Sequence, residues 1–240
     1  LDANGTIKLD GNYPTGSHNV ALGDTALDSA SLSGANNVAL GSNALSLNTS
    51  GAQNIGIGRN ALDANTTGEN NIGIGHVSLS ANSTGGNNVA IGREALQANT
   101  TANNNVAVGY HALFDNTTGT FNSAYGTQAL ANNTTANSNV AVGYQSLYAN
   151  TTGVKNSVLG TNALDANTTG ANNVAVGFEA LTANTTASNN TAVGYQAGLV
   201  TTTGASNAFF GRRTAVTNTT GANNAAFGAN ALSSNTTGGS

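Results

Sequence analysis

An internal repeat of 17 residues runs through nearly the whole chain and constrains its fold more than any other feature. The pattern is Asn, any residue, a small residue, an apolar residue and Gly. Its asparagine recurs thirteen times, with a first interval of 18 residues and later intervals of 17. These asparagines are Asn19, Asn37, Asn54, Asn71, Asn88, Asn105, Asn122, Asn139, Asn156, Asn173, Asn190, Asn207 and Asn224. Repetition at a fixed short period is typical of stacked architectures, so we expect a solenoid.

We number the repeat from this asparagine as positions one to seventeen, with residues 54–70 as the reference copy. Position five is Gly in every copy, and position four is apolar or aromatic. Position nine is Leu in all copies except two, which hold Gly198 and Ala215. Positions twelve to fourteen are usually Asn-Thr-Thr, followed by Gly or Ala. Because this Asn, Thr and Gly chemistry is typical of turns, we expect each copy to bend back on itself.

The repeat is too short for helical hairpins, which need roughly 33 to 45 residues. Its Val-Ala-Val segments, such as 106–108, alternate as strands do. We therefore predict an all-β fold: a parallel β-solenoid, of the β-roll or β-helix kind, with one strand-turn-strand-turn unit per 17-residue coil. Adjacent coils would lie about 4.8 Å apart. The solenoid would span 19–240 and continue beyond it, whereas 1–18, with the sole proline, would be an N-terminal cap or the end of an upstream domain.

Strand alternation also predicts a core. Positions two and four, such as Val106 and Val108, share one face of the strand. We expect that face to pack against the leucine at position nine, for example Leu113. Position three, which is Ala or Gly in most copies, would then point to a second close contact with a partner chain. We expect position-one asparagines to stack as hydrogen-bonded ladders, and the chain to self-associate as a parallel homotrimer or a filament.

Composition excludes several functional classes. The chain has no Cys and only six Lys and Arg, so thiolate chemistry and a nucleic-acid partner are not expected. No apolar run is long enough to cross a bilayer, so we expect no membrane insertion in this segment. His18, His76 and His111 fall at different places in the repeat, and the carboxylates are scattered. We therefore expect no catalytic residues, no cofactor and no metal site, and we predict that the protein is not an enzyme.

Position six is the most variable position of the repeat, and it holds most of the Arg and half of the Tyr residues. Variable side chains on a fixed scaffold are how solenoids build binding faces. The alternative is that an exposed position is simply under little constraint. The candidate ligand-binding residues are Arg59, His76, Arg93, Tyr110, Tyr144, Phe178, Tyr195 and Arg212.

The Asn-Thr-Thr segments admit two further readings besides turn chemistry. As N-x-[ST] motifs they are acceptors for N-glycosylation, and one glycan per coil would sheath a filament. The candidates are Asn48, Asn65, Asn82, Asn99, Asn116, Asn133, Asn150, Asn167, Asn184, Asn218 and Asn235. The other reading is an array of Thr that orders water or binds ice, although adjacent strand residues point to opposite faces, so only one Thr row would lie on it.

Several copies carry a family resemblance. The segments 88–92, 105–109 and 139–143 resemble the N-S-V-A-I-G element of trimeric autotransporter adhesin heads, and 190–197 resembles the N-T-A-V-G-Y-Q-A-L repeats of phage-tail-fibre-type proteins. The resemblance implies a parallel β-roll, trimeric and exposed on a cell surface or virion. The adhesin heads typically use a shorter coil. On this basis we expect a non-enzymatic extracellular fibre or adhesin shaft that binds carbohydrate or other surface polymers, with a water-ordering solenoid as the alternative.

Overall fold

The computed structural model describes residues 17–239 and confirms the predicted fold class, a parallel β-solenoid. Within these residues the regular structure is thirteen short strands, each covering positions two to four of one repeat. They are β1 Val20–Leu22, β2 Val38–Leu40, β3 Ile55–Ile57, β4 Ile72–Ile74, β5 Val89–Ile91, β6 Val106–Val108, β7 Ser123–Tyr125, β8 Val140–Val142, β9 Ser157–Leu159, β10 Val174–Val176, β11 Thr191–Val193, β12 Ala208–Phe210 and β13 Ala225–Phe227. The predicted cap at 1–18 lies almost entirely outside the described residues.

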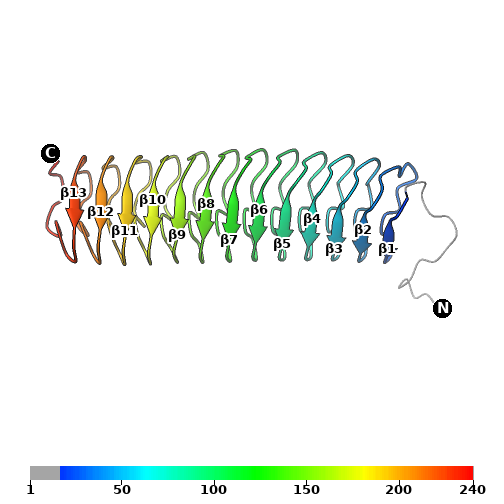
Figure 1. Ribbon diagram of the computed structural model, residues 1–240, viewed down its shortest axis with the longest axis horizontal. Helices are drawn as coiled ribbons and strands as arrows, with labels where there is room; N and C mark the ends of the chain where they lie inside the picture. Colours follow the sequence, from blue (N-terminus) through cyan, green and yellow to red (C-terminus); the bar gives the residue numbers. More distant parts are fainter. Residues whose placement is uncertain (1–16, 240) are drawn as a thin grey trace. The chain divides into compact units, whose positions relative to one another are not determined.

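The chain forms two compact units, which we describe separately: unit 1 ends at Thr120 and holds β1 to β6, and unit 2 begins at Phe121 and holds β7 to β13. Within each unit, strands that follow one another in the sequence pair in parallel, side by side (Figure 1). Ile55 pairs with Ile72, one repeat later, whereas Val20 pairs with Val38 across the single longer interval. The parallel register therefore places the same repeat position of successive coils above one another.

Each coil contains one strand and not the two that we predicted. The remaining residues form turns, and the backbone turns at four positions with positive φ: five, seven, nine and seventeen. Position five favours Gly because of its positive φ, and it requires Gly also because the next coil lies too close for a side chain. A Cβ on Gly58 would lie 2.7 Å from the carbonyl carbon of Gly75 in the next coil. Leu62, at position nine, adopts φ +55°, a conformation that costs an L-residue roughly 1–2 kcal/mol.

The strands turn the opposite face to the core from the one that we predicted. Leu113 is fully buried, as expected, but it shares the interior with position three and position eight, represented by Ala107 and Ala112. Val106 and Val108 are only partly buried and face outward. The interior of a 17-residue coil is narrow: a Cβ on Gly56 would lie 3.3 Å from Cγ of Leu45. Because the large side chain comes from position nine, only Ala or Gly fits opposite it in most coils.

Two asparagine ladders close the interior, one of them at position one as predicted. The backbone N–H of Asn54 donates to Oδ1 of Asn37 in the preceding coil (2.9 Å), and Asn54 Nδ2 donates to the carbonyl of Gly68 (2.8 Å). Position twelve forms the second ladder, in which Asn65 Nδ2 donates to Asn48 Oδ1 (2.8 Å). These buried amides pair with one another and with backbone carbonyls, as buried polar groups must.

Residues 190–206 form an irregular coil. Gly198 replaces the position-nine leucine, and a Cβ there would lie 3.0 Å from Cδ2 of Phe209. Phe209 is fully buried at position three of the next coil, where most copies hold Ala. One phenylalanine therefore fills the volume that leucines fill elsewhere.

Candidate binding surfaces

Row six, the set of position-six side chains, faces solvent next to the strands. The left-handed turn at Gly of position five re-aims the chain between the strand and this row. Tyr110, Tyr144 and Tyr195 are 39%, 48% and 47% exposed, as a ligand-binding role for this row requires. The other candidate residues are also exposed: Arg59, His76, Arg93, Phe178 and Arg212. In unit 1 the row is largely basic from Arg59 to Arg93, whereas in unit 2 it is aromatic from Tyr144 to Tyr195 except at Thr161.

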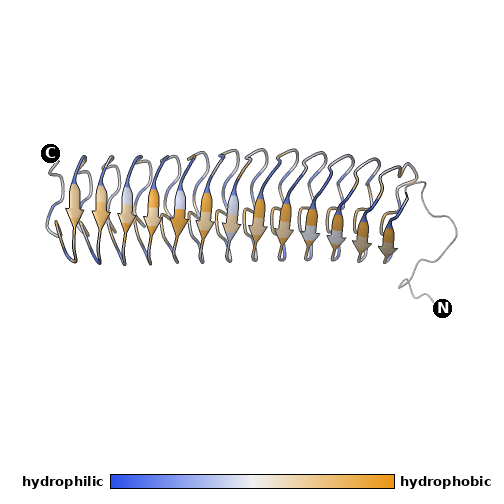
Figure 2. Ribbon diagram, in the orientation of Figure 1, coloured by the Kyte–Doolittle hydropathy of each residue, from blue (hydrophilic) through white to orange (hydrophobic). Residues whose placement is uncertain are grey.

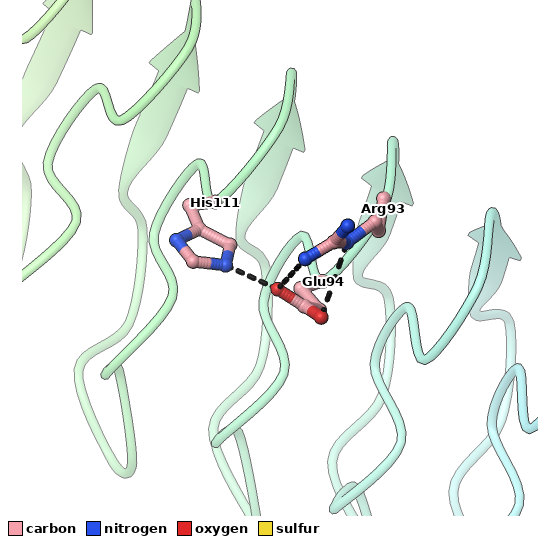
Figure 3. Close-up of polar contacts among 3 residues, drawn as sticks. All are labelled: Arg93, Glu94 and His111. Carbon is pink, nitrogen blue, oxygen red and sulfur yellow. Dashed lines mark hydrogen bonds and ion pairs between the residues drawn. The ribbon is translucent and has the colours of Figure 1, made fainter.

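Unit 1 joins row six to row seven, the position-seven side chains, through a charged cluster. Arg93 Nε donates to Oε1 of Glu94 (3.2 Å), and the same carboxylate contacts Nε2 of His111 in the next coil (Figure 3). The hydrogen bond from Arg93 lowers the pKa of Glu94; partial burial opposes this shift and the His111 contact adds to it. Arg93 remains well exposed, so the cluster resembles a solvated surface network more than a catalytic site.

The aromatic rings of this cluster stack on one another. The Arg93 guanidinium lies 5.0 Å from the Tyr110 ring centroid, and the His111 ring stacks on Tyr110 with centroids 3.9 Å apart. Phe114, at position ten, stacks on His111 in turn, with centroids 4.4 Å apart. Since Tyr110 has these two neighbours, less of its ring is free for a ligand than its exposure suggests.

Unit 2 presents its aromatic side chains differently. Tyr144 lies between Thr127 and Thr161 in row six, so no ring flanks it within its row. Phe178 and Tyr195 are in successive coils and stack almost parallel, with an interplanar angle of 9° and centroids 5.5 Å apart. These residues form the most open aromatic part of row six.

Row seven was missed by the sequence reasoning. Gln145 donates to Gln128 one coil earlier (3.0 Å), and Gln196 donates to Glu179 (2.8 Å). The signal was present, because position seven holds Thr, Asn, Gln, Glu, His or Arg in all copies except the one with Val77. These polar groups tie neighbouring coils together and lie directly beside row six in the chain.

The outer strip, formed by positions two and four of the strands, is the second surface of interest. In unit 1 every such residue is Val, Ile or Leu. In unit 2 it includes the exposed Tyr125, Val140 and Leu159, and the small hydroxyl residues Ser123, Ser157 and Thr191. Figure 2 shows orange in the strands of both units, with paler segments in β3, β4, β7, β9 and β11. The strip contains no charged residue.

The predicted glycosylation does not fit this fold. Ten of the eleven candidates are fully buried: Asn48, Asn65, Asn82, Asn99, Asn116, Asn133, Asn150, Asn167, Asn184 and Asn218. Partly buried Asn235 makes the same contacts, donating from Nδ2 to Asn218 Oδ1 and the carbonyl of Gly238. A glycan on Nδ2 would remove one of these two hydrogen bonds and needs space that the core lacks. Turn and ladder chemistry therefore accounts for the motif.

The Thr residues of the same motif form one exposed row. At position thirteen the hydroxyl is used internally, as when Thr66 Oγ1 donates to the carbonyl of Ser83 (2.9 Å). At position fourteen the side chain is exposed, as at Thr67 and Thr84. The water-ordering alternative therefore has a single row of free hydroxyl side chains with which to act.

Two aspartates at position ten are partly buried. Burial raises the pKa of Asp63 and of Asp165, and Glu179 raises that of Asp165 further. Residues 17–239 contain no group of three or more His, Cys, Asp or Glu side chains placed to hold a metal ion. Over the same residues no helix could cross a membrane.

Comparison with known proteins gives no relative from which a function could be carried over. No protein-family model, curated protein or solved structure matches this chain. Its candidate function therefore rests on the two surfaces described above.

Proposed function

We propose that this chain is a non-enzymatic structural segment of an extracellular fibre or adhesin shaft, on a cell surface or virion. It assembles with copies of itself through the outer strip and presents row six to surface carbohydrate. The solenoid fold is compatible with a structural or fibre role. The observation that carries the proposal is the outer strip, an apolar face on parallel strands.

Parallel sheets whose strands read as continuous apolar runs are nearly always covered on both faces. Here the inner face covers the coil interior, and the outer face carries Val, Ile and Leu without a single charge. Depletion of charge is also the compositional signature of interface cores. By strand spacing and residue rise, the strip of either unit covers about 300 Å² in flat projection, within the range of the largest apolar patches on monomers. A patch of this size is often functional on a monomer, and further copies of this chain are the partner that we propose for it.

The structure changes the surface on which self-association was first predicted. Position three was expected to contact a partner chain, but it is buried inside the coil. We therefore assign the contact with a partner chain to positions two and four. Three parallel copies remain the proposed arrangement, because the resembling adhesin and fibre families imply it.

Light scattering on the purified chain tests the assembly. We expect a folded species close to three times the chain mass of 23.6 kDa. Ile57→Lys with Ile74→Lys, which places charges at position four of two successive coils, should give smaller, less assembled species. Thr67→Lys with Thr84→Lys adds the same charge at the exposed position fourteen and should leave the mass unchanged. A folded wild-type monomer would rule out the self-association proposal.

A further inference from the structure

We propose that row six of unit 2 binds an extended, neutral β-1,4-linked glycan chain that lies along the stack of coils, with one sugar for each coil. This inference rests on the carbohydrate-binding role proposed above and names the class of glycan. It is carried by the spacing and the alternation of the side chains in this row.

The spacing comes from the parallel register. Successive coils of unit 2 pair position for position, so row-six side chains are separated by about 4.8 Å. An extended β-1,4-linked chain, such as cellulose or chitin, advances by a similar distance for each sugar. Each of its sugars is also turned over relative to the one before. The same face of the sugar therefore returns at every second coil.

Row six alternates with the same period. It reads Thr127, Tyr144, Thr161 and Phe178 in four successive coils, a hydroxyl followed by an aromatic ring, twice. The two rings are thus two coils apart, which is the distance at which an extended β-1,4 chain repeats. Aromatic rings can stack on the C–H face of a sugar. The Thr between them can donate and accept hydrogen bonds at the intervening sugar.

Neighbouring groups fit a neutral polyhydroxyl ligand. Row seven supplies the amides of Gln128 and Gln145 and, two coils further, the carboxylate of Glu179. Amides offer both donors and acceptors to sugar hydroxyls, and a carboxylate offers acceptors. From Thr127 to Tyr195 row six carries no charge, unlike the Arg59–Arg93 part of unit 1. Tyr195 breaks the alternation, but its stack with Phe178 holds that ring in place.

Binding of the full-length chain to particulate cellulose and chitin tests the ligand class. Loss of protein from the supernatant is measured with each polymer, and isothermal titration calorimetry is performed with a soluble cello- or chito-oligosaccharide. Amylose and a β-1,3-glucan, whose chains coil, are the comparison polymers. We expect binding to cellulose, chitin or both, and at least about tenfold weaker binding to the coiled polymers, equivalent to about 1.4 kcal/mol. Equal binding to all four, or binding only to the coiled ones, overturns the inference.

A composition-matched variant tests the spacing. In a Tyr195→Thr background, Tyr144→Thr combined with Thr127→Tyr moves one ring by a single coil, so that the two rings left in row six of unit 2 are three coils apart and meet opposite faces of the sugar chain. Tyr195→Thr alone, which keeps Tyr144 and Phe178 two coils apart, is the reference protein. We expect affinity for the β-1,4 polymer to fall about tenfold, or about 1.4 kcal/mol. Tyr148→Thr, at position ten, is the control and should bind as the wild type does. Unchanged affinity in the folded triple variant, relative to Tyr195→Thr alone, overturns the inference.

The outcome can be separated from that of the proposed function. Self-association is measured by light scattering on the same samples and does not depend on a glycan. If the chain assembles and binds only other glycans, the carbohydrate-binding role stands and the β-1,4 inference fails. If it binds no glycan, both the inference and the carbohydrate-binding role fail. The proposed self-association through the outer strip is then still tested separately, by the mass of the species measured in light scattering.

Discussion

The coil of residues 54–70 and the coil of residues 190–206 have the same backbone plan but differ inside. In the first, Leu62 fills the interior, and Asn65 bonds to the asparagines of both neighbouring coils. In the second, Gly198 and Thr201 stand at the same two positions. Phe209 restores the lost volume, but nothing restores the lost amide. Among the described residues, Thr201 Oγ1 and Asn184 Oδ1 are buried without a hydrogen-bond partner.

The difference shows which kinds of interaction can be moved between coils. Packing needs atoms of about the right total volume, which a neighbouring coil can supply. A hydrogen bond needs a donor and an acceptor at one distance and angle. A leucine in this fold can therefore be replaced from the next coil, whereas an asparagine of the ladder cannot.

Phe209→Ala should give the largest loss of stability, about 3–5 kcal/mol, which is the usual cost of truncating a buried phenylalanine. Its own coil has Ala215 at position nine and the preceding coil has Gly198, so neither coil has a position-nine leucine to fill the cavity. Urea denaturation monitored by circular dichroism measures the loss. Adding Gly198→Leu to Phe209→Ala should recover part of it, since other coils hold Leu at a similar φ. A loss of under about 0.5 kcal/mol would mean that the side chain is not a core residue.

Leu113→Ala makes the corresponding test in a regular coil. We expect a loss of about 2–5 kcal/mol, because the side chain is fully buried and its neighbour at position three is only Ala107. The same urea titration applies. Leu47→Ala, at an exposed position eleven, is the control and should change stability by less than about 0.5 kcal/mol.

Thr201→Asn should make the irregular coil more like the regular one and should therefore stabilise it, in contrast to the two losses above. The new amide can donate to Asn184 Oδ1, and relief of a buried unpaired group is worth roughly 1–3 kcal/mol. Amide hydrogen exchange should show slower exchange in residues around 184 and 201. Thr203→Asn, at the exposed position fourteen, should leave exchange there unchanged. Faster exchange in the Thr201→Asn protein would mean that the irregular coil does not simply lack one amide of the position-twelve ladder.

Asp165→Asn should have the smallest effect, a gain of a few tenths of a kcal/mol at pH 7, because solvent screens a half-buried group. Burial, and then Glu179, raise the pKa of Asp165 above the ordinary 3.8, so the fold disfavours its charged form. This penalty is absent below pH 3.8 and grows as the pH rises through the raised pKa. The gain from Asp165→Asn should therefore disappear in acid. Asp63→Asn, where burial is the raising cause, should gain less; thermal melts at pH 3 and pH 7 compare the two variants.

The period and the invariant Gly were enough to predict a parallel solenoid, because they reflect backbone demands that recur in every coil. Leu113 was also placed correctly. The facing of the strands was predicted wrongly, since Val106 and Val108 are larger than Ala107 and were assigned to the core. In a coil this narrow the large residue at position nine already fills the interior, which forces the small residue of the strand inward. Strand alternation alone cannot distinguish the two facings when one side is small and the other apolar.

The candidate sites divide in the same way. The exposure of row six could be predicted from its charged members, because unpaired charges are rarely buried. The N-x-[ST] motifs left turn chemistry and glycosylation both open, because a local pattern says nothing of burial; in the fold Asn65 is used for its amide inside the coil. The contacts of Tyr110 with Arg93 and His111 depend on which side chains stand one coil apart, so only the register of coils reveals them.

The near identity of successive coils also has a consequence for how the chain finds its register. A pairing error of one residue would turn every strand side chain to the opposite face, and the narrow interior would reject it. An error of one whole coil keeps nearly every contact, so the interior scarcely opposes it. The departures from the consensus are what tell neighbouring coils apart. Phe209 packs against Gly198, where a larger side chain would meet its ring, so the irregular coil helps to fix the alignment of its neighbours.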